Sequence, residues 1–262
     1  MASMGLQHGV SSSTPTRIAL GPGKVYVDFG RSTEAEMGAM LGGGEFRLNR
    51  GLHHVQPDGA KGKVKGLTFV DTVEATLTLN LLETTKNNLV RCITAANTLA
   101  WTDGEAVGTG DGSTKEFTLD NTPDEAVLRV YDDGTLKTAT TDYSVSATTL
   151  TFVTAPTSGA AITADYTYAG TPADGDYWRL TGDTAIATGD HLTNLTVICE
   201  HTGDSAQGCV IQLHNPLANG DLTWSLPAQQ HEIVFPVTWE AYFDSSALTT
   251  EPWEIWVPEG IS

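Results

Sequence analysis

One stretch of the chain, residues 69–97, constrains the fold more than any other part of the sequence. Its first half alternates strictly between apolar and polar residues. The apolar members of this alternation are Val73, Ala75, Leu77 and Leu79. A period of two is typical of a strand that buries one face and leaves the other in water. The stretch therefore predicts a long amphipathic strand over residues 70–80.

The second half of the same stretch changes to helical spacing. Its apolar residues are Leu82, Leu89, Cys92, Ile93 and Ala96. Asn80 followed by Glu83 resembles a capping box, so we expect the helix to begin there and to run for about four turns. No other segment of the sequence shows a comparable helical pattern.

The composition favours a mainly β protein around this strand and helix. The 262 residues include 27 glycines and only 8% aromatic residues, which indicates short strands and frequent turns. Acidic residues number 32 against 14 basic ones, for a net charge of -18. This balance disfavours a surface that binds nucleic acid through its phosphates, and it suits a surface to which DNA must not adhere.

The three cysteines, Cys92, Cys199 and Cys209, form no CxxC pair. We interpret them as reduced, partly buried thiols of a protein that folds in a reducing compartment. The first residues lack the features of a signal peptide, and no apolar run is long enough to span a membrane, so we expect neither.

The segments on either side of the central stretch are assigned by the same rules. Residues 1–16 are polar and without period, which predicts a mobile arm. Residues 16–29 predict a strand pair around the Gly21-Pro22-Gly23 turn. Further strands are expected at residues 45–52, 192–200, 208–214, 232–243 and 251–257. Pro236 lacks an N–H donor, so the strand over 232–243 should lie at an edge or a bulge.

Residues 53–66 contain Pro57 and several glycines and show no apolar period. We expect an exposed β-hairpin arm or loop there. Basic residues gather in and beside this segment, namely Arg50, Lys61, Lys63 and Lys65. Two interpretations stay open, a solvated hairpin or an arm that docks on an acidic patch of another copy.

Residues 107–169 predict a separate small all-β module of four or five short strands. Asp133-Gly134 between two apolar runs is a two-residue hairpin signal. The flanks at 102–106 and 169–176 are rich in Gly, Asp and Pro and predict linkers. We therefore expect a domain inserted in a loop of its parent, which resumes at Tyr177.

The sequence offers no catalytic or metal-binding motif. The seven histidines form neither an HExxH motif nor a pairing with cysteines at metal spacing. Gly108, Gly110 and Gly112 form a GxGxG pattern, but no helix follows to complete a phosphate site. The acidic turns at Asp132-Asp133 and at residues 110–113 are weak calcium candidates, because turns favour Asp for backbone reasons. We expect no enzyme, no metal and no cofactor.

In their order, these segments resemble the major tail tube protein of long, non-contractile-tailed bacteriophages. The resemblance covers roughly residues 16–100 and 176–258, and it depends mainly on EATLTLNLLETTKNNL and on VTWEAYFD with the EPW that follows. It implies a β-sandwich or half-barrel with one flanking helix. The implied limits are an arm at 1–16, the tube domain at 17–104 and 176–262, and an inserted domain at 105–175. The inserted domain resembles an element common in phage structural proteins, where it is usually displayed outward.

The resemblance also implies a function, that of a virion structural protein of the tail, assembled in the host bacterial cytoplasm. Six copies would form a ring, and rings would stack into a tube through which DNA is ejected without specific binding. Six copies at -18 each would carry a charge of -108. The implied partners are further copies of the chain and the tape measure, tail terminator and tail tip proteins, with no membrane.

Two sets of site residues follow from this resemblance. The candidates for ring stacking are Arg50, His53, His54, Asp58, Lys61, Lys63 and Lys65. The candidates for lining the bore, where they would repel phosphates, are Glu74, Glu232 and Glu240. The strands over 70–80 and 232–243 are expected to find missing partners in neighbouring copies.

Two other classes of protein compete with a tube subunit. One is a phage decoration or receptor-binding protein whose inserted β domain binds host surface glycans. The other, a secreted β-sheet hydrolase, is disfavoured because no signal peptide and no plausible catalytic pair are found.

Overall fold

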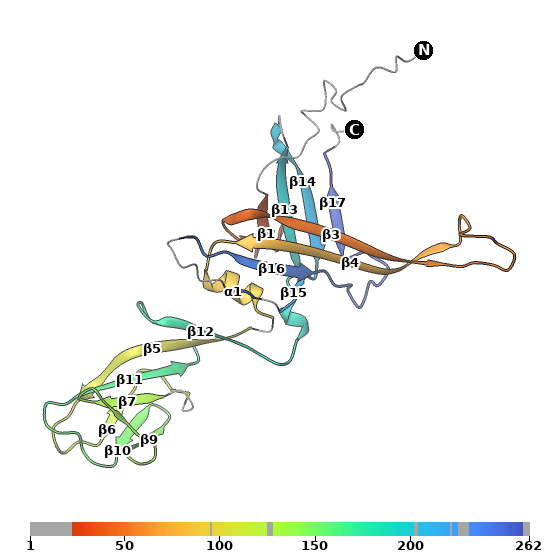
Figure 1. Ribbon diagram of the computed structural model, residues 1–262. Coiled ribbons are helices and arrows are strands. Elements are labelled where there is room, and N and C mark those ends of the chain that lie inside the picture. Colours follow the sequence, from red (N-terminus) through yellow and green to blue (C-terminus); the bar gives the residue numbers. More distant parts are fainter. Residues whose placement is uncertain are drawn as a thin grey trace. The chain divides into compact units, whose positions relative to one another are not determined.

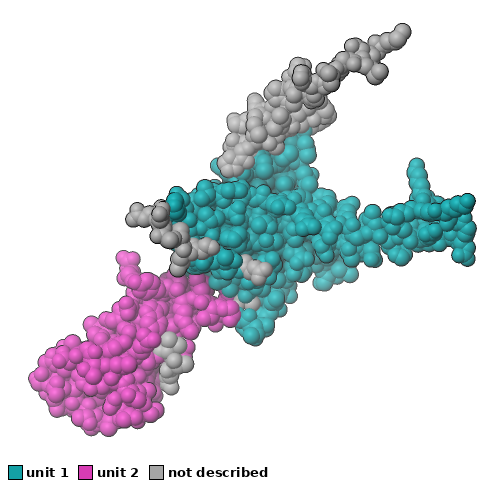
Figure 2. Space-filling model, viewed as in Figure 1, with its two compact units in different colours: residues 1–95, 183–262 teal, residues 96–182 magenta. Residues whose placement is uncertain are grey.

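The computed structural model describes residues 23–94, 96–124, 128–201, 204–220, 222–224 and 231–258. Antiparallel strands dominate these residues, with one α-helix, so the expected mainly β class is confirmed (Figure 1). The expected arm at 1–16 and the first half of the strand pair around Gly21 lie outside the described residues. The chain forms two compact units, unit 1 (residues 1–95 and 183–262) and unit 2 (residues 96–182) (Figure 2).

Unit 1 contains two antiparallel sheets. The first has the order β17-β14-β13-β1-β2 and the second has the order β15-β16-β4-β3. The strands of the first sheet are β1 (Lys24–Val27), β2 (Ala35–Glu36), β13 (Asn194–His201), β14 (Asp204–His214) and β17 (Trp253–Trp256). Those of the second are β3 (Met40–His54), β4 (Thr68–Leu81), β15 (Leu217–Ala218) and β16 (Phe235–Glu240). A short 3-10 turn lies at Thr188–Asp190.

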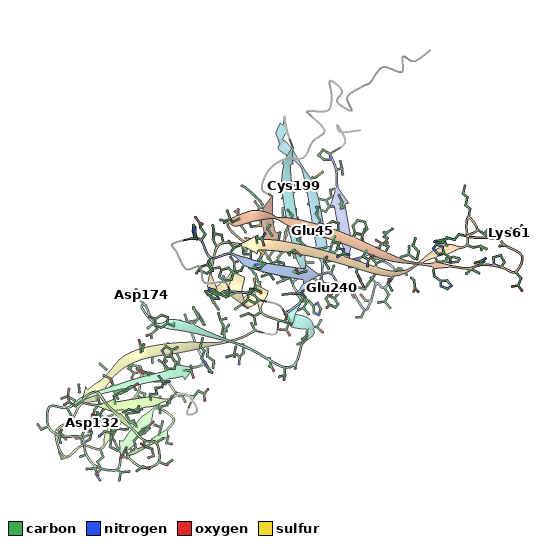
Figure 3. All side chains as sticks on the ribbon, viewed as in Figure 1. Glu45, Lys61, Asp132, Asp174, Cys199 and Glu240 are labelled. Carbon is green, nitrogen blue, oxygen red and sulfur yellow. The ribbon has the colours of Figure 1, made fainter. Side chains whose placement is uncertain are left out.

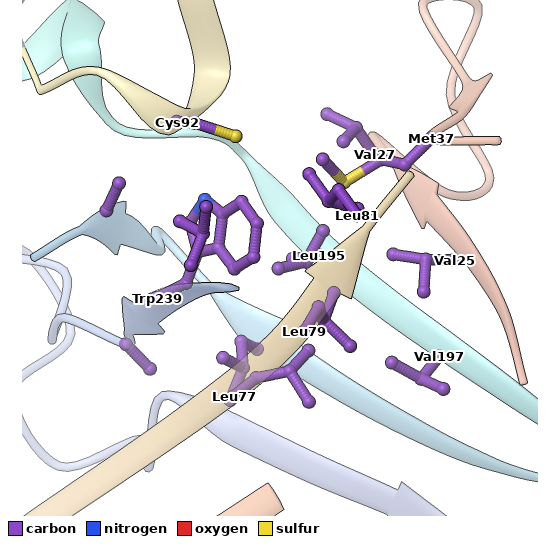
Figure 4. Close-up of a cluster of buried hydrophobic side chains, with 14 of the residues drawn as sticks. Val25, Val27, Met37, Leu77, Leu79, Leu81, Cys92, Leu195, Val197 and Trp239 are labelled. Carbon is purple, nitrogen blue, oxygen red and sulfur yellow. The ribbon is translucent and has the colours of Figure 1, made fainter. Parts of the chain in front are cut away.

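The two sheets of unit 1 share one apolar core, so unit 1 is a β-sandwich. The strands of one sheet cross those of the other in Figure 1. The alternating apolar residues of β4 and the odd-numbered residues of β16 face strands β1, β13 and β14 across this core (Figure 4). The labelled side chains from the two sheets are Leu77, Leu79, Leu81 and Trp239 on one side and Val25, Val27, Leu195 and Val197 on the other.

The helix is shorter and begins later than the capping-box pattern predicted. α1 spans Lys86–Cys92, and its N-cap is Thr85, whose side chain accepts a hydrogen bond from the Asn88 N–H. Strand β4 continues to Leu81 because Asn80 pairs with Pro236 in the sheet. Glu83 caps no helix, and its carboxylate accepts a hydrogen bond from the Ala39 N–H at 2.9 Å.

α1 closes one end of the sandwich core. Cys92 is buried there, and the burial raises the pKa of its thiol to about 12. The Asn88 side chain donates to the Met37 carbonyl at 2.8 Å, and the Trp239 indole donates to the Arg91 carbonyl at 3.4 Å. These bonds attach the helix to both sheets, since Met37 follows β2 and Trp239 belongs to β16.

The expectation that the strand over 70–80 lacks partners within its own chain is wrong for its second half. β4 pairs with β3 from Thr68 to Leu81, and residues 76–81 also pair with β16 on the other side. Among the described residues, the partly unpaired strand is β16 itself. β15 covers Trp239 and Glu240, and the Asn219 N–H donates to the Thr238 carbonyl, so residues 235–237 have no strand partner on that side. Pro236 lies on the stretch that β15 leaves uncovered, which agrees with its expected place at an edge.

Unit 2 is a second, smaller pair of antiparallel sheets with its own core. The strand orders are β6-β10-β9 and β12-β5-β11-β7-β8. The strands are β5 (Ala96–Thr109), β6 (Glu116–Thr118), β7 (Arg129–Asp132), β8 (Thr135–Lys137), β9 (Tyr143–Ser146), β10 (Thr149–Phe152), β11 (Ala161–Tyr168) and β12 (Tyr177–Gly182). The two-residue turn expected at Asp133-Gly134 joins β7 to β8, and both residues have positive φ angles, 49° and 73°.

The limits of unit 2 lie outside the predicted 105–175. β5 and β12 pair with each other from Tyr177↔Trp101 to Gly182↔Ala96. The predicted linker at 102–106 is part of β5, where Gly104 has a φ of 73° beside a register shift in the pairing with β11. The Asp165 carboxylate accepts a hydrogen bond from the Gly104 N–H at 2.8 Å. The Asp-Gly pair therefore marks a bulge inside a strand.

The shared core of unit 1 predicts a matched pair of stability effects. Leu81 is 1% exposed and Leu248 is 69% exposed. We expect Leu81→Ala to lower the free energy of unfolding by about 2–5 kcal/mol, through lost burial and the cavity that remains. Leu248→Ala should change it by no more than about 0.5 kcal/mol. Chemical denaturation of both variants measures the difference, and equal effects would contradict the assigned core.

Candidate assembly surfaces

The distal half of the β3–β4 hairpin is exposed on both faces. Beyond Gly51 the register shifts, and almost every residue from Leu52 to Thr72 is exposed. Three of its apolar side chains, Leu52, Phe69 and Val70, are 54%, 54% and 49% exposed. We call residues 52–72 the arm; Figure 3 labels Lys61 near its far end. A strand pair this apolar and without a covering layer is typical of an interaction surface.

Local hydrogen bonds define the shape of the arm. The Val55 N–H donates to the Leu67 carbonyl at 2.9 Å, and the Gln56 amide donates to the Ala60 carbonyl at 2.9 Å. His54 Nδ1 and the Thr68 hydroxyl lie 2.9 Å apart. The arm therefore keeps a hairpin shape without packing on a core, as the sequence led us to expect for residues 53–66.

The arm carries six of the seven predicted stacking residues. Asp58, Lys61, Lys63 and Lys65 are exposed near its tip, and His53 and His54 occupy its strands. None of the three lysines forms an ion pair with another described residue. The tip therefore presents positive charge on a chain whose net charge is -18.

Arg50, the seventh predicted stacking residue, lies at the base of the arm and interacts with the body of unit 1. Its guanidinium forms an ion pair with Glu251 and lies 5.5 Å from the centre of the Trp253 ring. Arg50 has the same parity in β3 as Phe46 and Leu48, which pack on the core, so it faces the other sheet. Unlike the lysines, Arg50 makes contacts within its own chain, and these contacts connect β3 to the segment around β17.

The outer face of the second sheet is polar and acidic. Glu74 is exposed on β4, and Glu240 on β16 pairs across from Thr76, so both acids lie on this face. The Thr78 and Thr238 hydroxyls are 2.8 Å apart, and the Asn49 amide donates to Glu74 at 3.1 Å. These contacts order hydroxyl, amide and carboxylate groups across three neighbouring strands.

Glu232, the third acid predicted to line the bore, is not part of a strand of this sheet. Glu232 is exposed in the extended segment before β16, and no pairing includes it. The sequence analysis missed Glu45, which pairs with Thr78 and is exposed on the same face (Figure 3 labels Glu45 and Glu240). The alternation of Phe46 and Leu48 with polar neighbours was the signal, because it already placed odd-numbered residues of β3 on the wet side.

The second sheet ends in a long unpaired edge. β3 has 15 residues, and among the described residues only β4 pairs with it. Gly42 and Gly43 have φ angles of 85° and 79°, and a register shift separates Met40 from Gly44. Beyond this irregular start the edge offers free N–H and C=O groups that can pair with another strand.

The described residues contain no group of three potential metal ligands. Hydrogen bonds from Thr114 and Ser113 hold the pKa of Asp111 well below its usual range, so this carboxylate acts as a turn cap. A cavity of about 490 Å³ adjoins His191, whose Nδ1 lies 3.1 Å from the Asn215 carbonyl and whose ring contacts Tyr242.

Helices of the length and apolarity needed to cross a membrane do not occur in the part of the chain that the structure describes. No protein-family model matches the chain, and no curated protein matches its sequence. The arm, the acidic face and the β3 edge are therefore the features of the molecule that bear on its function.

The exposure of the arm predicts that its removal leaves the body of unit 1 intact. Replacing residues 54–68 by Asn-Gly would let His53 and Phe69, which are paired, flank a two-residue turn. We expect the midpoint of thermal unfolding to change by less than about 2 °C, because the removed residues bury little apolar surface. Differential scanning calorimetry measures the shift, and a large fall in the midpoint would show that the arm supports the body.

Proposed function

We propose that this chain is a virion structural protein, which assembles through unit 1 into stacked rings that form the tail tube of a long, non-contractile-tailed bacteriophage. The observation that carries the proposal is the unpaired β3 edge together with the two-sided exposed arm on one small sandwich. Both features are liabilities in a monomer and useful in an assembly of identical copies.

Ring formation uses the two ends of the second sheet. β3 ends the sheet on one side, and on the other side residues 235–237 of β16 pair with no described strand besides β4. A contact between β3 of one copy and this part of β16 in the next copy is head to tail, and such contacts close into a ring when the rotation permits. The sheet then continues from copy to copy, with six copies expected from the family resemblance.

The acidic outer face of the second sheet lines the bore in this arrangement. Glu45, Glu74 and Glu240 outnumber Arg47, the exposed basic residue opposite Thr76 on the same face, and so leave the face negative. The threonine hydroxyls and Asn49 keep it hydrated. Negative side chains repel the phosphates of DNA and prevent the adhesion that a basic lining would cause. DNA therefore passes through without specific binding.

Stacking of rings uses the arm. Its apolar side chains gain burial against a neighbouring ring, and its three lysines are attracted to the acidic surface of that ring. The proposal places the assembled protein in the virion tail, built in the host bacterial cytoplasm, with tape measure, tail terminator and tail tip proteins as partners. It includes no enzymatic activity, cofactor or membrane.

A second candidate function is supported by the separate core of unit 2. A module that folds around its own core can be displayed for recognition of host surface glycans, as in a decoration or receptor-binding protein. Under that alternative the chain forms a small closed oligomer, and unit 2 carries the function.

Assembly of the purified chain separates these two functions. We expect rings or filaments in negative-stain electron microscopy of the full chain. The variant lacking residues 54–68 should form rings that do not stack, because it retains the β3 edge but loses the outer part of the arm with its three lysines and with Val55 and Val64. Small closed oligomers from the full chain, with no rings under any buffer tested, would contradict the tube proposal.

A deletion of unit 2 is the matched control for that experiment. Ala96 and Gly182 are paired neighbours, so a short Gly-Ser linker can replace the residues from 96 to 182. Rings and filaments should persist in this variant. Their loss, with unit 1 still folded by circular dichroism, would favour the alternative in which unit 2 is central.

The acidic face predicts a change in DNA binding. In assembled tubes, Glu74→Lys with Glu240→Lys should raise co-sedimentation of double-stranded DNA at least about tenfold at low salt, and the gain should fall as salt rises. Glu116→Lys with Asp133→Lys, the same change of charge in unit 2, serves as the control for a general charge effect. Equal DNA binding by the two double variants would remove the assignment of this face to the bore.

A further inference from the structure

Two of the three cysteines face each other across neighbouring strands. Cys199 on β13 pairs directly with Cys209 on β14, in a register that runs unbroken from Asn194↔His214 to Glu200↔Gly208. Both thiols are free and partly exposed. Residues directly opposite in an antiparallel pair have Cα atoms about 4.5–5.5 Å apart, within the range that a disulfide spans. We propose that Cys199 and Cys209 form a reversible disulfide when the folded protein meets an oxidant.

The neighbouring pair shows how closely the strands approach at this point. A Cβ built on Gly208 would lie 2.4 Å from the Cys199 carbonyl oxygen, so only glycine fits beside the cysteine pair. Both cysteines share strand parity with inward-facing residues, Val197 and Leu213, and therefore lie on the same side of the sheet. Two sulfurs on one side of a close strand pair need only small side-chain rotations to bond.

A small oxidant can reach the Cys199 member of this pair. Cys199 lines a cavity of about 300 Å³ between the two sheets, together with Gly23, Met40 and Phe46. Cys92 is excluded as a competing partner, because it is 2% exposed and belongs to α1 instead of to the strand pair. The arrangement therefore favours one disulfide and one remaining thiol.

The reaction requires a disulfide of low molecular weight, such as oxidised glutathione, as the electron acceptor. The thiolate of one cysteine attacks it, forms a mixed disulfide and releases one reduced thiol. The thiolate of the other cysteine then attacks the protein sulfur of the mixed disulfide and releases the second thiol. The two cysteines lose two protons and two electrons, and the acceptor is reduced to two thiols. The bond would staple β13 to β14 just before their register shifts, between Glu200 and His201.

Mass spectrometry of the full chain tests this proposal. After incubation of the folded protein with oxidised glutathione, we expect an intact mass lower by about 2 Da than after treatment with dithiothreitol. Thiols titrated after denaturation should fall from three to one. Peptide mapping should link Cys199 to Cys209, and the thermal midpoint should rise by at least about 2 °C.

Two variants make the outcome decisive. Cys92→Ser should still lose about 2 Da, whereas Cys209→Ala should not, and should instead take up glutathione at Cys199 or remain unchanged. Circular dichroism verifies that each variant is folded, and Cys199→Ala replaces Cys209→Ala if the latter is not. An unchanged mass of the wild-type chain, or a disulfide that joins two chains or includes Cys92, would overturn the proposal. None of these results depends on whether the chain forms a tube.

Discussion

The contact between the inner faces of β4 and β16 and the strands of the opposite sheet is the interaction on which unit 1 depends. Leu77, Leu79 and Leu81 from one strand and Trp239 from the next fill the space between the sheets. Because side chains alternate along a strand, burying this apolar row forces Glu74, Thr76 and Thr78 to the opposite side. The acidic outer face is therefore a consequence of the same pattern that forms the core, and a shift of register by one residue would destroy both.

The same dependence explains which parts of the fold the sequence predicted. Alternation reports burial directly, so the long strands, the buried face of β16 and the turn at Asp133-Gly134 were all predicted from residues alone. The start of the helix was not predicted correctly, because Asn80 and Glu83 fit the local pattern of a capping box although Asn80 belongs to a strand. Long-range pairing of Asn80 with Pro236 decided in favour of the strand, and Thr85 became the cap. Sequence separation, here more than 150 residues, keeps such a decision out of reach of local rules.

The candidate surfaces also divide into features that local sequence patterns predicted and features that depend on long-range pairing. The composition of residues 53–66 predicted an exposed arm, and parity placed Glu74 and Glu240 on the wet side of their strands. Which strand ends a sheet is decided by the topology and not by the residues of one strand. The long open edge belongs to β3, although the amphipathic patterns had pointed to the strands over 70–80 and 232–243. Arg50 does not act with the three lysines of the arm tip. Its position in the alternation of β3 directs its side chain towards Glu251 and Trp253, which lie about 200 residues away along the chain. Glu45 has the opposite parity in β3, so its side chain lies on the outer, acidic face of the sheet.

Energetics connect these surfaces to assembly. An unpaired strand edge keeps its N–H and C=O groups hydrogen-bonded to water, so pairing it with another copy gains little per bond. Apolar burial supplies the larger part of the free energy. The arm contributes five exposed apolar side chains to it, namely Leu52, Val55, Val64, Phe69 and Val70. The edge then determines direction and register, and the arm contributes affinity. Charge adds selectivity, since the basic tip is attracted to acidic surfaces while the acidic faces of different copies repel each other and disfavour face-to-face aggregates. Under the proposed function, pairing of the edge is therefore sufficient for a ring, whereas a stack of rings requires the arm as well.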